Sequence, residues 1–426
     1  MKLKKELNIF YLVFLGLSNI IGAGIFVVSG IATSIAGPSV IFSFLIAGIA
    51  ASLIGMTIAE LSSAIHETGE SYTYTKKAFG KFLGFLVGWM RFLNYPLSIS
   101  AVSISFSSYL LAFFLPNFYN YAYVRIVSLL IIVFSTVLNI VGTRSALKIA
   151  TSLTLFKLFS LTFFILFGIF YAIKNFDANK INIIFPNGFS GMLQAASLVF
   201  FAYLGFQAIA MASEESDKPS KDIPLAITLS IFISSVFYIL VALVEVLNVH
   251  WSEFKNVNHA ILYTAQKIST NQYFLLLITI SALASMGSVI LATLYSGSRL
   301  TFAIARDNLF PSFLSKVSKR FYTPTNSIIA ISLISAIFVF SPSLSFLISI
   351  VNFTYLFSFI FSSLSLIKLR SKINPKFKLP FHPLVPLLTI AISLLLILAS
   401  EITSIIVSLF ALAIGVLIYF LKKKIS

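Results

Sequence analysis

The stretch "SNIIGAGIFVVSG", residues 18–30, decides the fold class of this chain. It lies inside a long apolar run, yet it contains Gly22, Gly24 and Gly30. A glycine in a helix interior is about 1 kcal/mol less favourable than alanine. Either close packing between helices or a functional break explains why a chain weakens the middle of its first hydrophobic helix.

The composition predicts a membrane protein. The 426 residues are 58% hydrophobic and only 10% charged, and the mean hydropathy is +1.00. Soluble domains are about a quarter charged. Many apolar blocks approach the roughly 20 residues that cross a bilayer as a helix. We therefore expect an all-α polytopic protein, with the basic start "MKLKKELNIF" leading into a retained first helix, because the apolar run that follows is too long for a signal peptide.

Hydropathy and turn residues predict twelve transmembrane helices. We expect them at 9–36, 39–66, 79–114, 122–141, 148–173, 191–213, 222–248, 272–305, 325–341, 345–368, 383–399 and 402–421. An even number of spans places both termini on one side of the membrane.

The basic residues predict which side that is. With the termini inside, the outer segments hold only Arg125, Lys174, Lys180, Lys255 and Lys267, and most other lysines and arginines lie in the inner segments. Because cytoplasmic loops are enriched in Lys and Arg, we expect cytoplasmic termini in the cell membrane. This bias explains the net charge of +17 without a nucleic-acid partner, and contact with anionic lipid is its generic consequence.

Several classes of function are disfavoured by the residues. The chain has no cysteine, and its four histidines are scattered without the spacing of metal ligands. No nucleophile–base pair or phosphate-binding loop is recognisable. We expect no catalytic residue, cofactor or metal, and hence no enzyme. The connecting segments are too short for a soluble domain, which disfavours a receptor or nutrient sensor, and the filter and voltage-sensor signals of a channel are also missing.

A second glycine interrupts the sixth expected helix, five helices after the first. The stretch "FFAYLGFQAIA", residues 200–210, has Gly205 near its middle. Transporters built from inverted five-helix repeats break corresponding helices at mid-membrane. Free N–H groups of one half-helix attract a carboxylate, and free carbonyls of the other attract an ammonium group. We favour this interpretation for Gly22, Gly24 and Gly205, and close packing for Gly30 and Gly48.

Four motifs resemble the amino acid–polyamine–organocation transporter family. They are "NIIGAGIFVVSG", "IAELSSAIHETGESYTYTKKAFG" (58–80), "FFAYLGFQAIAMASEESDKPSKDIPLAI" and "SGSRLTFAIARDNLFPSFL" (296–314). The resemblance implies a LeuT-like core of five plus five helices within residues 1–368, with halves at 9–173 and 191–368. Two further helices would occupy 383–421. It also implies a substrate with an α-amino acid head group or a related amine.

The resemblance also implies which backbone groups hold the substrate. N–H donors to the carboxylate would come from Ala23, Gly24 and Ile25. Carbonyl acceptors for the ammonium group would come from Ile20, Phe201, Ala202 and Leu204. Gly22 would permit the turn, Gly205 would leave room for the substrate side chain, and the Phe201 ring would cover the site.

Lys157 lies inside the fifth expected helix, where a charged lysine is energetically costly. Its stem is too short to reach the inner interface from there. The resemblance implies a role for it, because several sodium-independent members of the family carry a lysine at this place; we therefore expect Lys157 to link this helix to the first break in place of sodium. Gln207 stands where some relatives have an acid. If transport is proton-coupled, Lys157 is the leading candidate carrier and Glu245 the second.

Other polar residues form two candidate sets. Candidates for a cytoplasmic gate are Glu60, Glu214, Glu215, Arg306 and Asp307. Candidates for the side-chain pocket are Asn94, Tyr203, Gln207, Ser285 and Ser288. Arg91 also falls inside an expected span, and the sequence assigns it no role.

We therefore predict a secondary amino acid transporter that works by alternating access, with proton symport favoured. Since no acid clearly faces the expected pocket, neutral substrates are favoured. A sodium-independent exchanger of the same fold and a transporter of cationic amino acids or polyamines remain the alternatives. We expect no obligate protein partner, and the sequence leaves the oligomeric state open.

Overall fold

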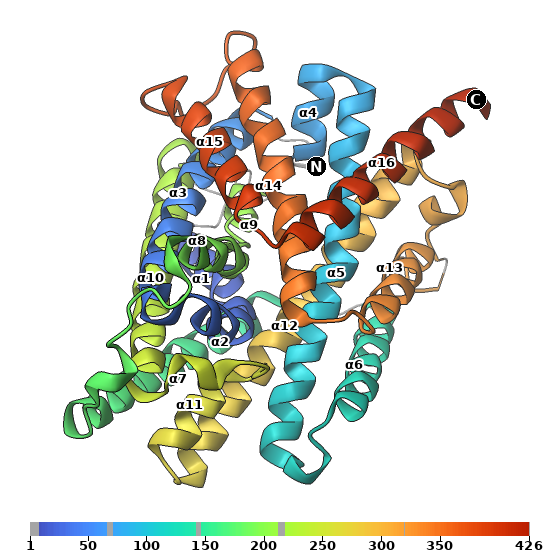
Figure 1. Cartoon of the computed structure of the whole chain (residues 1–426). Helices are drawn as coiled ribbons and strands as arrows, with labels where there is room; N and C mark the ends of the chain where they lie inside the picture. The colour runs from blue at the N-terminus through green and yellow to red at the C-terminus, as the bar shows by residue number, and fades with distance from the viewer. Residues whose placement is uncertain (1–7, 66–70, 142–145, 212–217, 319, 426) are drawn as a thin grey trace.

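The structure is a computed structural model that describes residues 8–65, 71–141, 146–211, 218–318 and 320–425 (Figure 1). All regular structure in these ranges is helical. The α-helices of the first half are α1 (Ile9–Ile20), α2 (Gly24–Ala36), α3 (Val40–Ala64), α4 (Ser71–Phe79), α5 (Lys81–Phe114), α6 (Tyr121–Val141) and α7 (Ala146–Lys174). Those of the second half are α8 (Gly188–Val199), α9 (Gln207–Met211), α10 (Pro219–Asn248), α11 (Ala260–Ile268), α12 (Gln272–Arg306), α13 (Thr325–Phe338), α14 (Leu344–Leu369), α15 (Leu384–Leu398) and α16 (Ile402–Ile425).

Nine helical stretches of the described chain are long and apolar enough to cross a membrane. They are Gly24–Ala64, Lys81–Phe114, Tyr121–Val141, Thr154–Lys174, Gly188–Ala210, Lys221–Asn248, Gln272–Arg306, Leu344–Leu369 and Ile402–Lys422. The first of them combines α2 and α3, and α1, α13 and α15 are shorter apolar helices. The chain is thus an all-helical membrane protein, with helix in every range where the sequence predicts a span.

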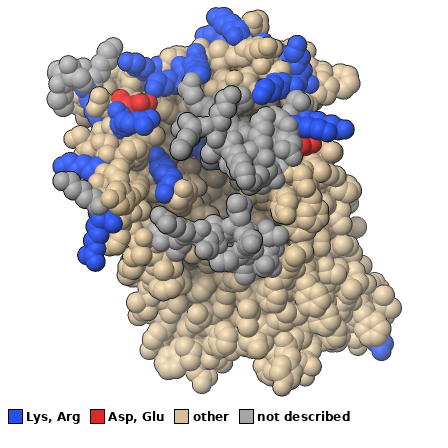
Figure 2. Space-filling model, turned by 180° about the vertical axis from the view of Figure 1, so that it is seen from behind, with Lys and Arg blue, Asp and Glu red and all other residues tan. Residues whose placement is uncertain are grey.

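The charged residues mark the two ends of the bundle. In Figure 1, α4 and the connection between α14 and α15 lie at the upper end, and α11 and the α5–α6 connection lie at the lower end. On the face drawn in Figure 2, nearly all visible lysines and arginines gather at the upper end, and the surface below them is almost free of charge. We call these the basic end and the opposite end.

The helices differ in how much of their apolar surface is covered. Most residues of α2 are buried, because α8, α10 and α11 pack around it. In contrast, α6 and α16 expose large apolar side chains such as Leu130, Phe134 and Phe410. An apolar helix that is buried on all sides belongs to the core of the bundle. An exposed apolar face on a membrane protein is suited to contact with lipid. The interrupted helices therefore lie inside the bundle.

The structure adds a helix in one connecting segment and moves the start of one expected span by two residues. The stretch 249–271, which connects two of the expected spans, contains α11 and a 3-10 turn at Trp251–Phe254. The reason is that α11 buries Ile261, Leu262 and Ala265 against the bundle. The third expected helix begins only at Lys81, because Gly80 adopts φ +88° and separates it from α4.

Candidate functional site

The first break separates α1 from α2. α1 ends at Ile20, α2 begins at Gly24, and the Gly22 N–H donates back to the Ile20 carbonyl at 2.7 Å. In an unbroken helix that N–H would bond to the carbonyl of Ser18. The break thus leaves carbonyls at the end of α1 and N–H groups at the start of α2 without helical partners.

The second break separates α8 from α9. Residues Phe200–Tyr203 form a 3-10 turn, Leu204 is extended, and Gly205 has φ +117° before α9 begins. The positive φ is one reason why this position requires glycine. The second is space, because a Cβ on residue 205 would lie 2.7 Å from the backbone oxygen of Asn19. Only glycine meets both conditions without strain. The side chain of Gln207 accepts the Gly205 N–H at 2.9 Å and so stabilises this turn.

The two breaks contact each other directly. A Cβ on Gly24 would lie 2.3 Å from the Cα of Ala202, so the start of α2 touches the backbone of the second break. The hydroxyl of Tyr238, on α10, contacts the carbonyl oxygen of Ile20 at 2.7 Å and that of Ala202 at 2.9 Å. One fully buried side chain therefore joins both unwound segments. Nothing in the sequence pattern pointed to Tyr238, because its spacing does not distinguish it from other apolar-helix tyrosines.

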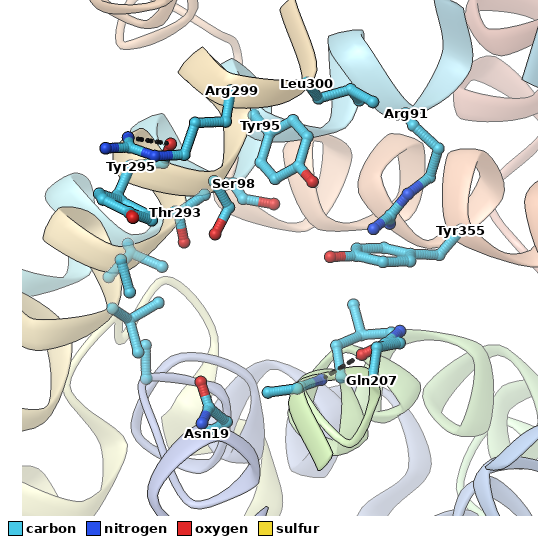
Figure 3. Close-up of a pocket in the computed structure, with 18 of the residues that line it drawn as sticks. Asn19, Arg91, Tyr95, Ser98, Gln207, Thr293, Tyr295, Arg299, Leu300 and Tyr355 are labelled. Carbon is cyan, nitrogen blue, oxygen red and sulfur yellow. Dashed lines mark hydrogen bonds between the residues drawn. The ribbon is translucent and has the colours of Figure 1, made fainter. Parts of the chain in front are cut away.

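A cavity of about 590 Å³ lies between the breaks and the helices that face them (Figure 3). From the breaks it is lined by Asn19, Ile20, Ala23, Gly24, Phe201, Leu204, Gly205, Gln207 and Ala208. The facing wall comes from α5, α12 and α14, and Figure 3 shows Arg91, Tyr95 and Tyr355 across the cavity from Asn19 and Gln207. Volume and lining suit a small organic molecule with polar groups.

Arginines and tyrosines form the facing wall. The guanidinium carbon of Arg91 lies 4.1 Å from the ring centre of Tyr355 and 5.7 Å from that of Tyr95. Arg299 lies 3.1 Å from the ring centre of Tyr295, and Arg306 lines the cavity toward the end of α12. No carboxylate is among the described residues that line this cavity. The wall therefore offers positive charge and aromatic faces that already pack on guanidinium groups.

Lys157 lies on α7 behind the first break. Its side chain is buried, and Nζ is 3.5 Å from the carbonyl oxygen of Ser18. This is the carbonyl that loses its helical partner when the Gly22 N–H turns toward Ile20. A cation at the C-terminal end of a helix is favoured by the helix dipole. The structure thus places Lys157 at the end of α1.

The cavity includes only some of the residues predicted for a side-chain pocket. Gln207 lines it, but Asn94 is buried toward α14, where its amide donates to Val351 and Thr354. Tyr203 points to α3, with its hydroxyl 2.9 Å from the Phe44 carbonyl. Ser285 and Ser288 are also away from the cavity lining, and among the break residues so are Gly22, Ile25 and Ala202.

Polar contacts join several helices at the basic end. Glu60 Oε1 lies 3.0 Å from Arg370 Nε, and its Oε2 accepts the Leu379 N–H. Asp307 accepts hydrogen bonds from Lys76 at 2.8 Å and from Tyr72 at 2.6 Å, which links α4 to the end of α12. Partial burial opposes the ionisation of Asp307, but these hydrogen bonds outweigh it and hold its pKa below the usual value.

The three other residues predicted for the gate do not join these contacts among the described residues. Glu214 and Glu215 lie outside the described residues, and Arg306 lines the cavity. Within the described ranges, no three His, Asp or Glu side chains gather as a metal site would require.

Tyr238→Phe is expected to weaken substrate binding by about tenfold, because two buried carbonyls at the breaks lose their partner. Binding can be measured with the purified protein by thermal-shift titration. Tyr203→Phe is the matched control: it also removes a buried tyrosine hydroxyl, but one that bonds to the Phe44 carbonyl and Ser235 rather than to the carbonyls of Ile20 and Ala202. Equal affinity in both variants would contradict the role of Tyr238.

The comparisons with known proteins identify the family to which the chain is similar. The family described as "Amino acid permease" matches residues 7–423. A branched-chain amino acid permease of Bacillus subtilis is 32% identical, over 99% of this chain and 94% of its own length. A methylthioribose transporter of the same organism is 33% identical over the same shares. The vacuolar cationic amino acid transporter 4 of Arabidopsis thaliana is 30% identical over 87% of this chain and 64% of its own length.

These relatives are permeases and transporters rather than enzymes. The family match covers nearly the whole chain, and two of these relatives align over almost their entire length. The protein is therefore a multi-pass membrane protein of the amino acid permease family.

Proposed function

We propose that this chain is a secondary transporter that carries neutral amino acids across the cell membrane by alternating access. The observation that carries the proposal is the pair of interrupted helices whose unwound segments touch each other and line one cavity. An amino acid bound there would place its carboxylate at the N–H groups of Ala23, Gly24 and Ile25. Its ammonium group would face carbonyls of Ile20 and of the second break.

The carbonyls are shared with the protein in this arrangement. Those of Ile20 and Ala202 share the single proton of the Tyr238 hydroxyl, and each carbonyl oxygen has a second lone pair. Phe201 and Leu204 line the cavity and would supply the remaining acceptors and the aromatic cover. The proposed site therefore uses backbone groups for the head group and leaves the facing wall to select the substrate's side chain.

The proposed architecture has twelve spans. Residues 1–368 would form the LeuT-like core, as two inverted halves within 9–173 and 191–368, and 383–421 would add two helices. The concentration of lysine and arginine at the basic end supports a cytoplasmic location for that end and for both termini. The contacts of Glu60 with Arg370 and of Lys76 with Asp307 lie there, and they would hold the inner gate.

The preference for neutral substrates rests on the cavity wall. Its described lining holds Arg91, Arg299 and Arg306 but no carboxylate, and guanidinium groups occupy the tyrosine faces that a cationic ligand would otherwise use. Two relatives are named branched-chain amino acid permeases, which agrees with an apolar substrate side chain. Others are named cationic amino acid transporters, so a cationic substrate is the alternative.

The experiment is uptake by proteoliposomes containing the purified protein. The panel contains labelled isoleucine, alanine, lysine, putrescine and methylthioribose, each with and without an inward proton gradient. Accumulation of isoleucine driven by the gradient would support symport. Isoleucine uptake that ignores the gradient but needs internal amino acid would mean exchange. Uptake of lysine, putrescine or methylthioribose alone would overturn the proposed substrate class.

Arg91→Gln is expected to let lysine compete at least about tenfold better against isoleucine, because the variant removes a positive charge from the cavity wall. The measurement is inhibition of isoleucine binding by lysine in the purified protein. Arg125→Gln is the control, since Arg125 packs near Phe340 and does not line the cavity. Unchanged lysine competition in Arg91→Gln would contradict the assigned selectivity.

A further inference from the structure

We propose that Glu245 is a proton-binding site near the opposite end of the bundle, and that its proton couples α2 to α10 during transport. The inference rests on the proposed transport function and specifies its driving ion. Glu245 lies on α10 one turn before the helix ends at Asn248. Its side chain is fully buried and lies outside the cavity described above.

Among the described residues, those whose hydrogen bonds hold the carboxyl group of Glu245 belong to α2. The Ser29 hydroxyl donates to Oε1 at 2.7 Å, and the Thr33 hydroxyl contacts Oε2 at 3.3 Å. These two residues are one helical turn apart, so they present their hydroxyls on one face of α2. A hydroxyl can donate or accept a hydrogen bond. Ser29 and Thr33 can therefore bond to Glu245 both as a carboxylate and as a protonated carboxylic acid. A site that binds and releases a proton needs partners that fit both forms.

The neighbouring elements provide no counter-charge for a carboxylate. α2 has no ionisable residue, and α5 contributes Tyr109, whose hydroxyl donates to the Phe26 carbonyl of α2. His259, just before α11, packs against Tyr109 with ring centres 6.1 Å apart. Burial lowers the pKa of His259 to about 4, so this imidazole is neutral at pH 7.

Three of the four lysines at this end are bound elsewhere, and the fourth, Lys255, is exposed on the surface. Lys180 donates to the Asn248 carbonyl at 2.9 Å, and Lys174 on α7 lies 4.5 Å from the ring centre of Phe170. Lys267 on α11 forms an ion pair at 2.7 Å with Glu253, and this bond lowers the pKa of Glu253. Within the described ranges, no lysine, arginine or histidine lies within ion-pair distance of Glu245.

Burial without a counter-charge favours the neutral form of Glu245. An ionised carboxylate removed from water is strongly unfavourable unless a cation or several donors compensate it. The packed arrangement of α2 on α10 therefore favours the state in which the proton is bound. Separation of α2 from α10 would admit water and favour ionisation. By linkage, a proton on Glu245 stabilises the arrangement in which α2 packs on α10.

The position of α2 connects this site to the substrate. Gly24 at its start lines the cavity, and Ser29 lies five residues further along the same helix, or about 7.5 Å. A rigid movement of α2 would therefore change both sites together. This is the linkage that a symporter requires between proton and substrate.

Two measurements test the proposal, with Glu245→Gln as the variant and Glu253→Gln as the matched control. The first is infrared spectroscopy of the purified full-length protein at pH 7. We expect the carbonyl stretch of a protonated carboxylic acid in the wild type, its loss in Glu245→Gln, and its retention in Glu253→Gln. A wild-type spectrum without this band, or a band that persists in Glu245→Gln, would overturn the proposal. This readout does not depend on any substrate being transported.

The second measurement uses labelled isoleucine in proteoliposomes. For each protein we compare accumulation driven by an inward proton gradient with exchange against internal isoleucine. Glu245→Gln is expected to lower the ratio of the two at least tenfold relative to the wild type, and Glu253→Gln to leave it unchanged. An unchanged ratio in Glu245→Gln, or wild-type uptake that ignores the gradient, would overturn the proton site. If no isoleucine is transported by the wild type, the proposed substrate is wrong, and the infrared result still decides the proton site.

Discussion

Gly24→Ala is expected to weaken substrate binding by about tenfold to a hundredfold, since an added Cβ at a close backbone contact costs about 1–3 kcal/mol. The Cβ would lie 2.3 Å from the Cα of Ala202 and 2.9 Å from its Cβ. Backbone cannot turn aside as the end of a flexible side chain can, so α2 and the second break would have to separate. The N–H groups at the start of α2 would then leave their positions around the carboxylate. Binding by thermal-shift titration measures the loss.

Gly287→Ala on α12 is the control for this prediction. The nearest atom to its added Cβ is Cε2 of Phe106 at 3.8 Å, an ordinary contact distance. It also replaces a glycine inside an apolar helix, so it reports the general effect of alanine at such a site. If Gly24→Ala bound substrate as tightly as Gly287→Ala, the contact between the two breaks would have no role in binding. Size-exclusion profiles of both variants separate weak binding from misfolding.

The breaks could be predicted from the sequence because glycine has a direct physical meaning there. An apolar run long enough to cross the membrane predicts a helix whichever other helices pack around it. Gly24 and Gly205 weaken such helices, and in the structure each lies where one break touches the other, Gly24 against Ala202 and Gly205 against Asn19. In contrast, α11 was missed. It is only nine residues long, too short to count as a span, although the spacing of Ile261, Ala265 and Ile268 is that of an amphipathic helix.

The wall that faces the breaks could not be predicted in the same way. A helix such as α5, buried over much of its surface, has no polar face from which its rotation can be read. Asn94 and Arg91 are three residues apart on that helix, yet Arg91 lines the cavity and Asn94 bonds to α14. Tyr238 and Tyr355 were missed for the same reason. Their roles depend on which residues face them from helices distant in sequence.

Lys157→Met is expected to reduce isoleucine transport at least about tenfold, because a hydrogen bond to a charged group contributes about 1.5–3 kcal/mol. Nζ lies 3.5 Å from the Ser18 carbonyl, which the break has deprived of its helical donor. Methionine has a similar length and no charge, so it preserves packing while it removes the cation from the end of α1. We expect the break to lose its fixed geometry and the substrate to lose affinity. Initial rates in proteoliposomes, at concentrations that separate kcat from KM, measure the effect.

Lys174→Met is the control. It removes a lysine from the exposed end of the same helix and tests whether loss of any lysine on α7 reduces isoleucine transport. Lys174 packs on Phe170 and contacts neither break, so its replacement should leave transport unchanged. A rise in KM confined to Lys157→Met would mean that the lysine stabilises the substrate-binding form of the break, as a bound cation would. Normal transport by Lys157→Met would show that α1 ends at Ile20 without help from a cation, and the proposed link between α7 and the first break would then be wrong.

Because Glu245 lies on α10 and contacts α2, whereas Lys157 contacts α1, the variants Glu245→Gln and Lys157→Met act on opposite sides of the first break. Loss of gradient coupling in one and loss of affinity in the other would therefore assign the proton and the fixed charge to different residues.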